Sequence, residues 1–214
     1  MHKLKVMLVD DHAVVRMGFK LLLEACKDIE VVAESDSGEA ACQVCELAVP
    51  DVVVMDIAMT GIGGIEAIKR LTAKHSTIHI LALSAHEDIS HPVRALQAGA
   101  LGYLSKRSAP EALIDAIRAI AKGQRYVDSQ IAQRIAMQAI SGDKNPVEKL
   151  SAREFEVFEQ LARGQSVAQI SDTLNLSSST VGTHLYNIKQ KLSLNNQAEM
   201  TLLAVKHGLL NIAE

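Results

Sequence analysis

The chain has 214 residues, a net charge of −3 and a hydrophobic fraction of 48%, enough apolar side chain for a packed core, which excludes a disordered chain. No stretch approaches the roughly 20 uninterrupted apolar residues that a membrane-spanning helix needs. The N-terminal residues pass directly into a short apolar run and show no signal-peptide cleavage site. We therefore expect a cytoplasmic protein with one large domain or two small ones.

Residues 1–124 alternate between short apolar runs and amphipathic stretches of helical length. The apolar runs occupy residues 6–9, 31–33, 52–55, 80–83 and 101–104. The amphipathic stretches lie near residues 13–26, 37–48, 64–74, 87–98 and 109–123. Runs that are apolar throughout are typical of strands buried on both faces, as in a parallel sheet. Five strand–helix units in series predict an α/β domain with a doubly wound, five-stranded parallel sheet of the flavodoxin-like type.

Polar side chains follow the first, third, fourth and fifth of these strands. They are Asp10 and Asp11 after the first run, Asp56 after the third, Ser84 after the fourth, and Ser105 with Lys106 after the fifth. Because the carboxyl ends of parallel strands form one edge of the sheet, and sites in such sheets lie at that edge, these groups are expected to converge.

The three aspartates predict a site for a cation. At about 5 Å and an effective dielectric constant near 20, each ionised pair repels by roughly 3 kcal/mol. Oxygen ligands favour a hard ion, Mg²⁺ above all. A carboxylate can attack phosphorus to give an acyl phosphate, while the metal and Lys106 neutralise charge on the transferred group and Ser84 donates to it. Each residue alone would be an ordinary solvated loop residue, but the ordered set favours phosphoryl chemistry.

The remaining residues predict helices only. We expect a partly helical linker over 125–147, with a helix over 129–141 and turn residues over 141–146. Residues 148–214 then predict an all-α domain of four short helices. Its first helix begins with a capping-box pattern, Ser151 to Glu154, and ends at Gly164.

The second and third of these helices predict a helix-turn-helix. The second helix runs from Val167 to Leu174, and a tight turn at 175–177 follows it. In the third helix the apolar face consists of Val181, Leu185, Ile188 and Leu192, and the rest of its surface is polar. Two short helices, a tight turn and a polar-faced second helix are the expected build of this DNA-binding motif.

The acidic residues and the lysine make residues 4–124 similar to the receiver domains of two-component signalling. The resemblance implies that Asp56 is the phosphate acceptor and that the domain catalyses only its own phosphorylation and dephosphorylation. It implies a Mg²⁺ site made of Asp10, Asp11, Asp56 and the backbone carbonyl of Ala58, and switch residues Ser84, Tyr103 and Lys106. Tyr103 would turn inward as Ser84 moves toward the phosphoryl group; the alternative is an ordinary strand residue with an exposed hydroxyl. Thr60 stands where most receivers carry proline, which leaves that turn less constrained.

The spacing from Leu150-Ser-x-Arg-Glu to Lys191-Leu192 resembles the LuxR-type DNA-binding domain, and the whole chain resembles NarL/FixJ-type response regulators. The resemblance implies a sensor histidine kinase and double-stranded promoter DNA as partners, and a homodimer in the active state. The third helix would enter the major groove, and the DNA-contacting residues would be Ser178, Ser179, Thr180, Gly182, Thr183, Tyr186, Asn187, Lys189 and Lys191.

Net charge gives the DNA-binding hypothesis little support. Residues 148–214 contain six basic and seven acidic residues, a net charge of −1, whereas DNA-binding modules are usually basic. Gly182 stands where the family often has a basic residue. We therefore expect weak binding by a monomer, with a helical dimerisation module as the alternative.

Two other interpretations are less well supported. A haloacid-dehalogenase-type phosphatase would use Asp56 as its nucleophile but needs a general acid two residues later, where Ala58 stands. Cys42-x-x-Cys45 has no second pair to complete a zinc site, and both cysteines lie in a predicted helix as small core-side residues. The eight histidines form no ligand pattern.

Overall fold

The computed structural model describes residues 3–85, 88–141 and 145–210. The chain divides into two compact units: Met1–Glu87 with His91–Ala136, and Asp88–Ser90 with Met137–Glu214. Within the described ranges, no helix combines the length and the apolar character needed to cross a membrane.

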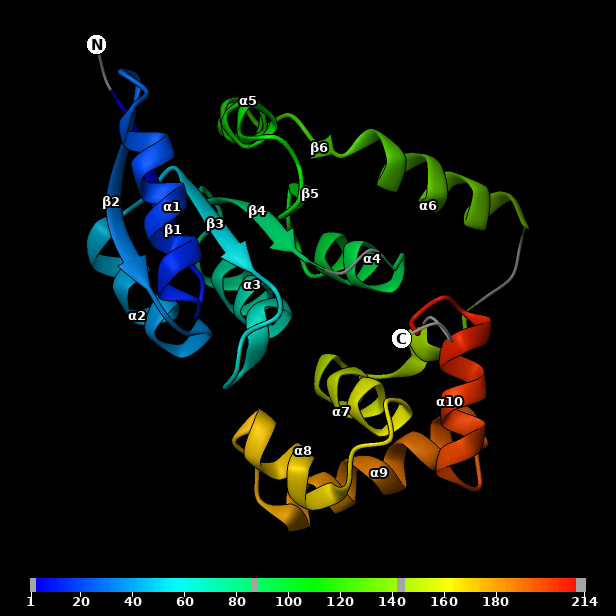
Figure 1. Ribbon diagram of the computed structural model, residues 1–214. Helices are drawn as coiled ribbons and strands as arrows, with labels where there is room; N and C mark the ends of the chain where they lie inside the picture. The colour runs from blue at the N-terminus through cyan, green and yellow to red at the C-terminus, as the bar shows by residue number, and fades with distance from the viewer. Residues whose placement is uncertain (1–2, 86–87, 142–144, 211–214) are drawn as a thin grey trace. The chain divides into compact units, whose positions relative to one another are not determined.

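The first unit is built on a parallel sheet of six strands with the order β2-β1-β3-β4-β5-β6 (Figure 1). The strands are β1 Leu4–Val9, β2 Ile29–Ser35, β3 Val52–Asp56, β4 His79–Ser84, β5 Gly102–Ser105 and β6 Tyr126–Val127. The predicted doubly wound α/β class is confirmed, but the predicted count of five strands is one too low. The extra strand, β6, has two residues and pairs beside Gly102 and Tyr103. Two residues are too few to give a periodic signal, so only pairing with β5 reveals this strand.

Five helices cover the two faces of this sheet: α1 Ala13–Glu24, α2 Gly38–Ala48, α3 Gly63–Lys74, α4 Ser90–Gln97 and α5 Pro110–Ala121. Successive residues of β3 point to opposite faces. Val52 and Val54 pack in a cluster with Leu23 of α1 and Ile117 of α5. Val53 and Met55 belong to the other cluster, with residues of α2 and α3. Both faces are therefore covered, which explains the uninterrupted apolar runs in the sequence.

The two cysteines of α2 serve the core. Cys45 is 1% exposed, and Cys42 packs against the same cluster. Burial raises the pKa of the Cys45 thiol to about 11, so the thiol stays protonated at neutral pH. Both cysteines are free, and the interpretation of them as core-side residues is confirmed.

The second unit is helical. The boundary between the two units falls within helix α6, Ser129–Ser141. Residues 142–144 of the predicted linker lie outside the described ranges. The 3₁₀ helix η1, Pro146–Lys149, precedes α7 Ala152–Ala162, α8 Val167–Leu174, α9 Ser178–Leu192 and α10 Gln197–Lys206. One apolar cluster holds these helices together, and Phe155, Ile170, Val181, Ile188 and Met200 are each at most 1% exposed.

Local capping defines one end of each of three helices in this unit. The predicted capping box is present in α7: Ser151 accepts from the Glu154 amide, and the Glu154 carboxylate accepts from the Ser151 amide. Asn175 ends α8 in the left-handed conformation, and the Ser177 side chain caps α9. The turn between them is therefore defined by a left-handed residue at its start and a side-chain cap at its end. The predicted four helices and helix-turn-helix are confirmed.

Candidate functional site

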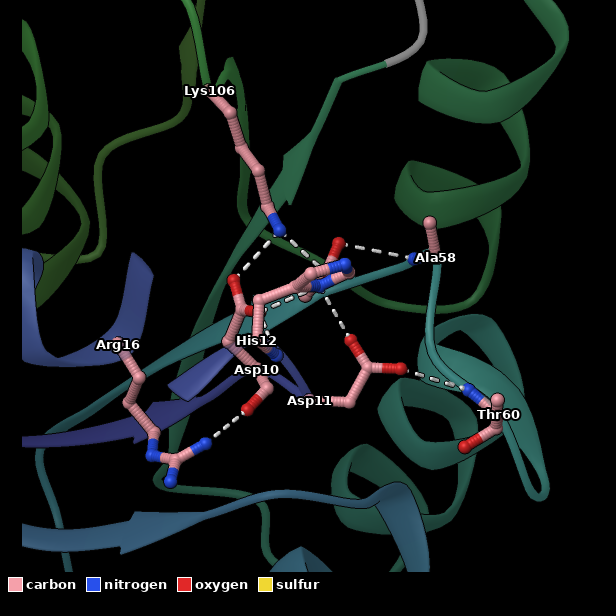
Figure 2. A network of polar contacts seen from close by, with 8 residues as sticks. Asp10, Asp11, His12, Arg16, Ala58, Thr60 and Lys106 are labelled. Atoms are coloured by element: carbon pink, nitrogen blue, oxygen red, sulfur yellow. Dashed lines mark hydrogen bonds and ion pairs between the residues drawn. The ribbon is translucent and has the colours of Figure 1, made fainter. Parts of the chain in front are cut away.

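Three strand ends bring the predicted acidic cluster together. Asp10 follows β1, Asp56 is the last residue of β3, and Lys106 follows β5. The Lys106 Nζ lies 2.6 Å from Asp10 Oδ2 and 2.7 Å from Asp56 Oδ2. The Asp56 side chain is 1% exposed and that of Asp10 is 5% exposed. Lys106 therefore joins two nearly buried carboxylates from different strands (Figure 2).

The loop after β3 completes the cluster through backbone amides. The amide of Ala58 donates to Asp56 Oδ1 at 3.1 Å, and the amide of Thr60 donates to Asp11 Oδ2 at 3.3 Å. Asp11, which follows Asp10 in the loop after β1, is thereby linked to the loop after β3 (Figure 2). One oxygen each from Asp10, Asp11 and Asp56 falls within a set of atoms that all lie within 4.8 Å of one another. This oxygen-rich group fits a divalent cation.

Burial and charge compete at this site. Burial raises the pKa of Asp56 above its ordinary value, although the hydrogen bond from Lys106 opposes the shift. Burial also disfavours the charge on Lys106, but its bonds to Asp10 and Asp56 outweigh that effect, and its pKa is raised. One lysine faces three carboxylates, so the cluster retains excess negative charge that a cation would offset.

Two glycines shape the loop after β3. A Cβ on Gly64 would lie 2.1 Å from the Asp56 carbonyl oxygen, so no side chain fits there. Gly61 has φ +80°, which favours glycine, and follows the unusual Thr60. Gly64 therefore allows close packing against the backbone of the acceptor strand, and Gly61 allows the turn.

Two of the three predicted switch residues, Ser84 and Tyr103, are buried. Ser84 ends β4 and is 0% exposed, and Tyr103 in β5 is also 0% exposed. Tyr103 packs in the cluster that contains Met55 and Ala82 of the neighbouring strands. The alternative interpretation of Tyr103, with an exposed hydroxyl, is therefore wrong.

The structure adds two residues that sequence reasoning missed. Arg16 donates from Nη1 to the Asp10 carbonyl at 2.5 Å and thereby braces the loop after β1. The His12 Nδ1 lies 2.8 Å from Asp11 Oδ1 and 3.4 Å from Asp10 Oδ1, and His12 belongs to the same group of potential metal ligands (Figure 2). The spacing of the eight histidines does not reveal His12, because the partners of His12 are carboxylates rather than other histidines.

In the second unit, the predicted DNA-contacting residues lie on α9. Ser178, Ser179, Thr180, Thr183, Tyr186 and Lys191 are exposed, whereas Gly182, Asn187 and Lys189 are partly buried. Some of their polar atoms serve the helix itself: the Thr183 hydroxyl donates to the Ser179 carbonyl at 3.1 Å. Residues 178–186 of α9 therefore present small hydroxyl side chains, one glycine and the tyrosine ring.

The two lysines of α9 differ in their surroundings. Lys191 Nζ donates to Glu154 Oε2 at 2.6 Å, and the Glu154 side chain is only 5% exposed. Burial opposes the charge on Glu154, but bonds from Lys191 and Ser151 outweigh it and lower its pKa. Lys189 makes no ion pair among the described residues. Lys191 thus tethers α9 to α7, and Lys189 is the more available cation.

Comparisons with known proteins agree with both units. Residues 6–118 match the model of the response regulator receiver domain, and residues 148–204 match that of bacterial regulatory proteins of the luxR family. The receiver match covers more than half of the chain.

Full-length relatives carry both regions in the same order. The chain is 42% identical to the response regulator UvrY of Escherichia coli K12 over 97% of this chain and 96% of UvrY. It is 40% identical to the response regulator GacA of Pseudomonas syringae over 97% of this chain and 98% of GacA. A structure of RcsB from Salmonella enterica bound to the promoter P1flhDC matches with a TM-score of 0.67 and 25% identity, over 96% of this chain and 100% of that chain. The chain belongs to the NarL/FixJ family of two-component response regulators, with a receiver domain followed by a LuxR-type DNA-binding domain.

Proposed function

We propose that Asp56 accepts a phosphoryl group from a sensor histidine kinase and that the modified protein binds promoter DNA as a homodimer. The observation that carries the proposal is the contact of Lys106 with both Asp56 and Asp10, at 2.7 and 2.6 Å, beside a third carboxylate. The proposed division places the receiver in residues 1–124, the linker in 125–147 and the DNA-binding domain in 148–214. The proposed location is the cytoplasm, where kinase and promoter are both accessible.

In the proposed transfer, a carboxylate oxygen of Asp56 attacks the phosphorus of the phosphohistidine. A P–O bond forms, the P–N bond breaks, and the electron pair returns to the imidazole of the kinase. The Ala58 amide and Lys106 hold Asp56 from two directions and orient it for this attack. Lys106 then binds an oxygen of the phosphoryl group and stabilises its charge.

The ligands proposed for Mg²⁺ are Asp11, Asp56 and the Ala58 carbonyl, with Asp10 acting through water. Their oxygen chemistry and the excess negative charge of the cluster support this assignment. The bound ion supplies charge neutralisation to the phosphoryl oxygens.

Ser84 and Tyr103 are proposed to transmit the modification. Ser84 donates its hydroxyl to a phosphoryl oxygen, and the space it vacates is filled by repositioning of the buried Tyr103 ring. The change alters the receiver surface that controls dimerisation and access to α9. Couplings of this kind are typically worth about 1–3 kcal/mol, so partial DNA binding without phosphate is expected.

Intact-protein mass spectrometry after incubation with Mg²⁺ and acetyl phosphate tests the chemistry. Wild type is expected to gain one phosphoryl group in a metal-dependent reaction, and Asp56→Asn to gain none. Asp115→Asn, an exposed carboxylate on α5, is the matched control and should behave as wild type. A folded wild-type protein that gains no phosphoryl group, or Asp56→Asn that gains one, would contradict the proposal.

DNA binding is tested separately by titrating promoter DNA at several salt concentrations with and without acetyl phosphate. Counterion release predicts that affinity falls steeply as salt rises. Phosphorylated protein is expected to bind more tightly than unmodified protein and as a dimer. A C-terminal unit that dimerises without salt-dependent DNA binding would instead be a dimerisation module.

A further inference from the structure

A polar cavity of about 350 Å³ lies between the loop after β5 and the start of α6, into which β6 leads directly (Figure 1). The residues that line it from the loop are Ser105, Arg107 and Ser108, and those from the α6 segment are Asp128, Ser129 and Arg134. All of them belong to the first unit. The three aspartates of the acidic cluster do not line this cavity, so it is a separate feature of the receiver.

Arginines from two different elements line this cavity. Arg107 lies in the loop after β5 and Arg134 in the second turn of α6, and both residues are exposed. Among the described lining residues only Asp128 is acidic, so two positive charges and one negative charge leave a net charge of +1. A guanidinium stays protonated at physiological pH, and its planar set of N–H donors fits the oxygens of a phosphate. The cavity therefore has the charge and the donor groups of an anion site.

Serine hydroxyls add neutral donors around the two arginines. Ser105, Ser108 and Ser129 line the cavity. Ser105 Oγ accepts from the Arg107 amide at 3.2 Å and keeps its own hydrogen for donation. The N-terminus of α6 carries partial positive charge, but Asp128 Oδ1 accepts from the Gln130 amide at 2.9 Å and offsets part of it. The guanidinium groups and hydroxyls, rather than the helix amides, are therefore the main groups that an anion would contact.

We propose that this cavity binds the phosphate group of a small phosphorylated molecule, with Arg107 and Arg134 contacting its oxygens from two elements. A phosphate presents anionic oxygens in several directions, whereas a carboxylate presents two in one plane, so donors that converge from two elements favour phosphate. The volume lies near the lower end of the range of about 300–1,000 Å³ typical of small-molecule sites, which favours a small ligand. The proposal does not depend on phosphoryl transfer to Asp56.

A phosphate bound in this way links the start of α6 to the receiver sheet. Arg107 follows β5 closely, and Arg134 lies on α6, so one ligand contacts both elements. Binding is therefore expected to slow hydrogen exchange of the backbone amides in the first turns of α6.

The experiment titrates the full chain with inorganic phosphate and with pyrophosphate by isothermal titration calorimetry, at fixed salt and with EDTA present. EDTA keeps the acidic cluster without the cation that a phosphate there would need. Pyrophosphate is expected to bind with a submillimolar dissociation constant, and inorganic phosphate more weakly. Arg107→Gln and Arg134→Gln are each expected to weaken pyrophosphate binding about tenfold, because each removes a charge-assisted hydrogen bond. Arg125→Gln removes an exposed arginine just before β6 that does not line the cavity, and this matched control should bind as wild type.

Asp128→Asn tests the sign of the charge effect. Asparagine keeps a side-chain oxygen that can accept from the Gln130 amide and cap α6, but it removes the negative charge. Pyrophosphate is expected to bind this variant severalfold more tightly. Circular dichroism checks that every variant folds. Absence of pyrophosphate binding by wild type, unchanged binding by either cavity arginine variant, or equal weakening in Arg125→Gln overturns the proposal and leaves the proposed chemistry of Asp56 unaffected.

Discussion

The acidic cluster and helix α9 use charge in opposite ways. In the cluster, three carboxylates and one lysine from three strand ends lie together, and two of the carboxylates are nearly buried. On α9, the polar residues lie along one continuous helix, and one of its two lysines is already bound to Glu154. The first region keeps an uncompensated charge that a ligand must satisfy, whereas the second has directed part of its charge into folding. Charge near a site is therefore informative only when its partners are known.

The largest effect is expected from removing the lysine of the cluster. Lys106→Met leaves Asp10 and Asp56 nearly buried without their cation, and we expect the free energy of unfolding of the receiver to fall by about 3–5 kcal/mol. Urea unfolding in the absence of metal measures this, and added Mg²⁺ should restore part of the loss. Lys74→Met, which breaks a surface pair with Glu46, is the control and should change stability little. Equal losses of stability for both substitutions would show that Lys106 stabilises the receiver no more than a surface ion pair does.

Asp56→Asn is expected to stabilise the receiver at neutral pH. Burial raises the folded pKa of Asp56 above its unfolded value. The folded state therefore gains stability from the protonated form below the unfolded pKa and loses it as pH rises through the folded pKa. Asparagine removes this loss, so we expect the variant to be more stable than wild type at pH 7 but not at low pH. Metal-free unfolding from pH 3 to 8 measures the effect; a gain independent of pH would contradict the assigned cause.

Substitutions of Lys189 and Lys191 on the same helix should affect different properties, DNA binding and stability respectively. Glu154 has a lowered folded pKa, so its bond to Lys191 contributes stability above the unfolded pKa that is lost as pH falls through the folded pKa. Because the Lys191 side chain is 41% exposed and solvent screens the bond, Lys191→Ala should cost about 1 kcal/mol. Lys189→Ala should leave stability unchanged but weaken binding to all sequences and reduce the salt slope by about one. Thermal unfolding and salt-dependent titration distinguish the two; selective loss at one DNA sequence would contradict a phosphate contact by Lys189.

The smallest expected effect is at Gly182. A Cβ there meets nothing within 4 Å, so a side chain fits without moving a neighbour. Gly182→Ala should stabilise α9 by about 0.5–1 kcal/mol because glycine is a poor helix former. Gly182→Lys should add a similar stability and also increase the salt slope of DNA binding by about one. If Gly182→Ala weakens DNA binding, the glycine is needed for close approach of the DNA rather than being a missing charge.

Much of this protein could be predicted from sequence because the informative patterns are local. Apolar runs with polar residues directly after them predicted the parallel sheet and the convergence of Asp10, Asp56 and Lys106. Helical periodicity predicted the helix that is α9, since Val181 and Ile188 recur on one buried face. Capping residues predicted where α7 begins. Each of these signals lies within a few consecutive residues and depends on backbone geometry that every chain shares.

The sequence by itself determined the fold class, the order of the two regions and the strand-end residues of the acidic cluster, because periodicity and strand direction are properties of consecutive residues. Tertiary structure alone decided which partner each charge finds. It placed β6 beside β5, brought Thr60 to Asp11 and Lys191 to Glu154, turned His12 toward the carboxylates and buried Tyr103. These contacts join residues whose side-chain directions depend on loop conformation and packing, and no periodic pattern in the sequence encodes either of them.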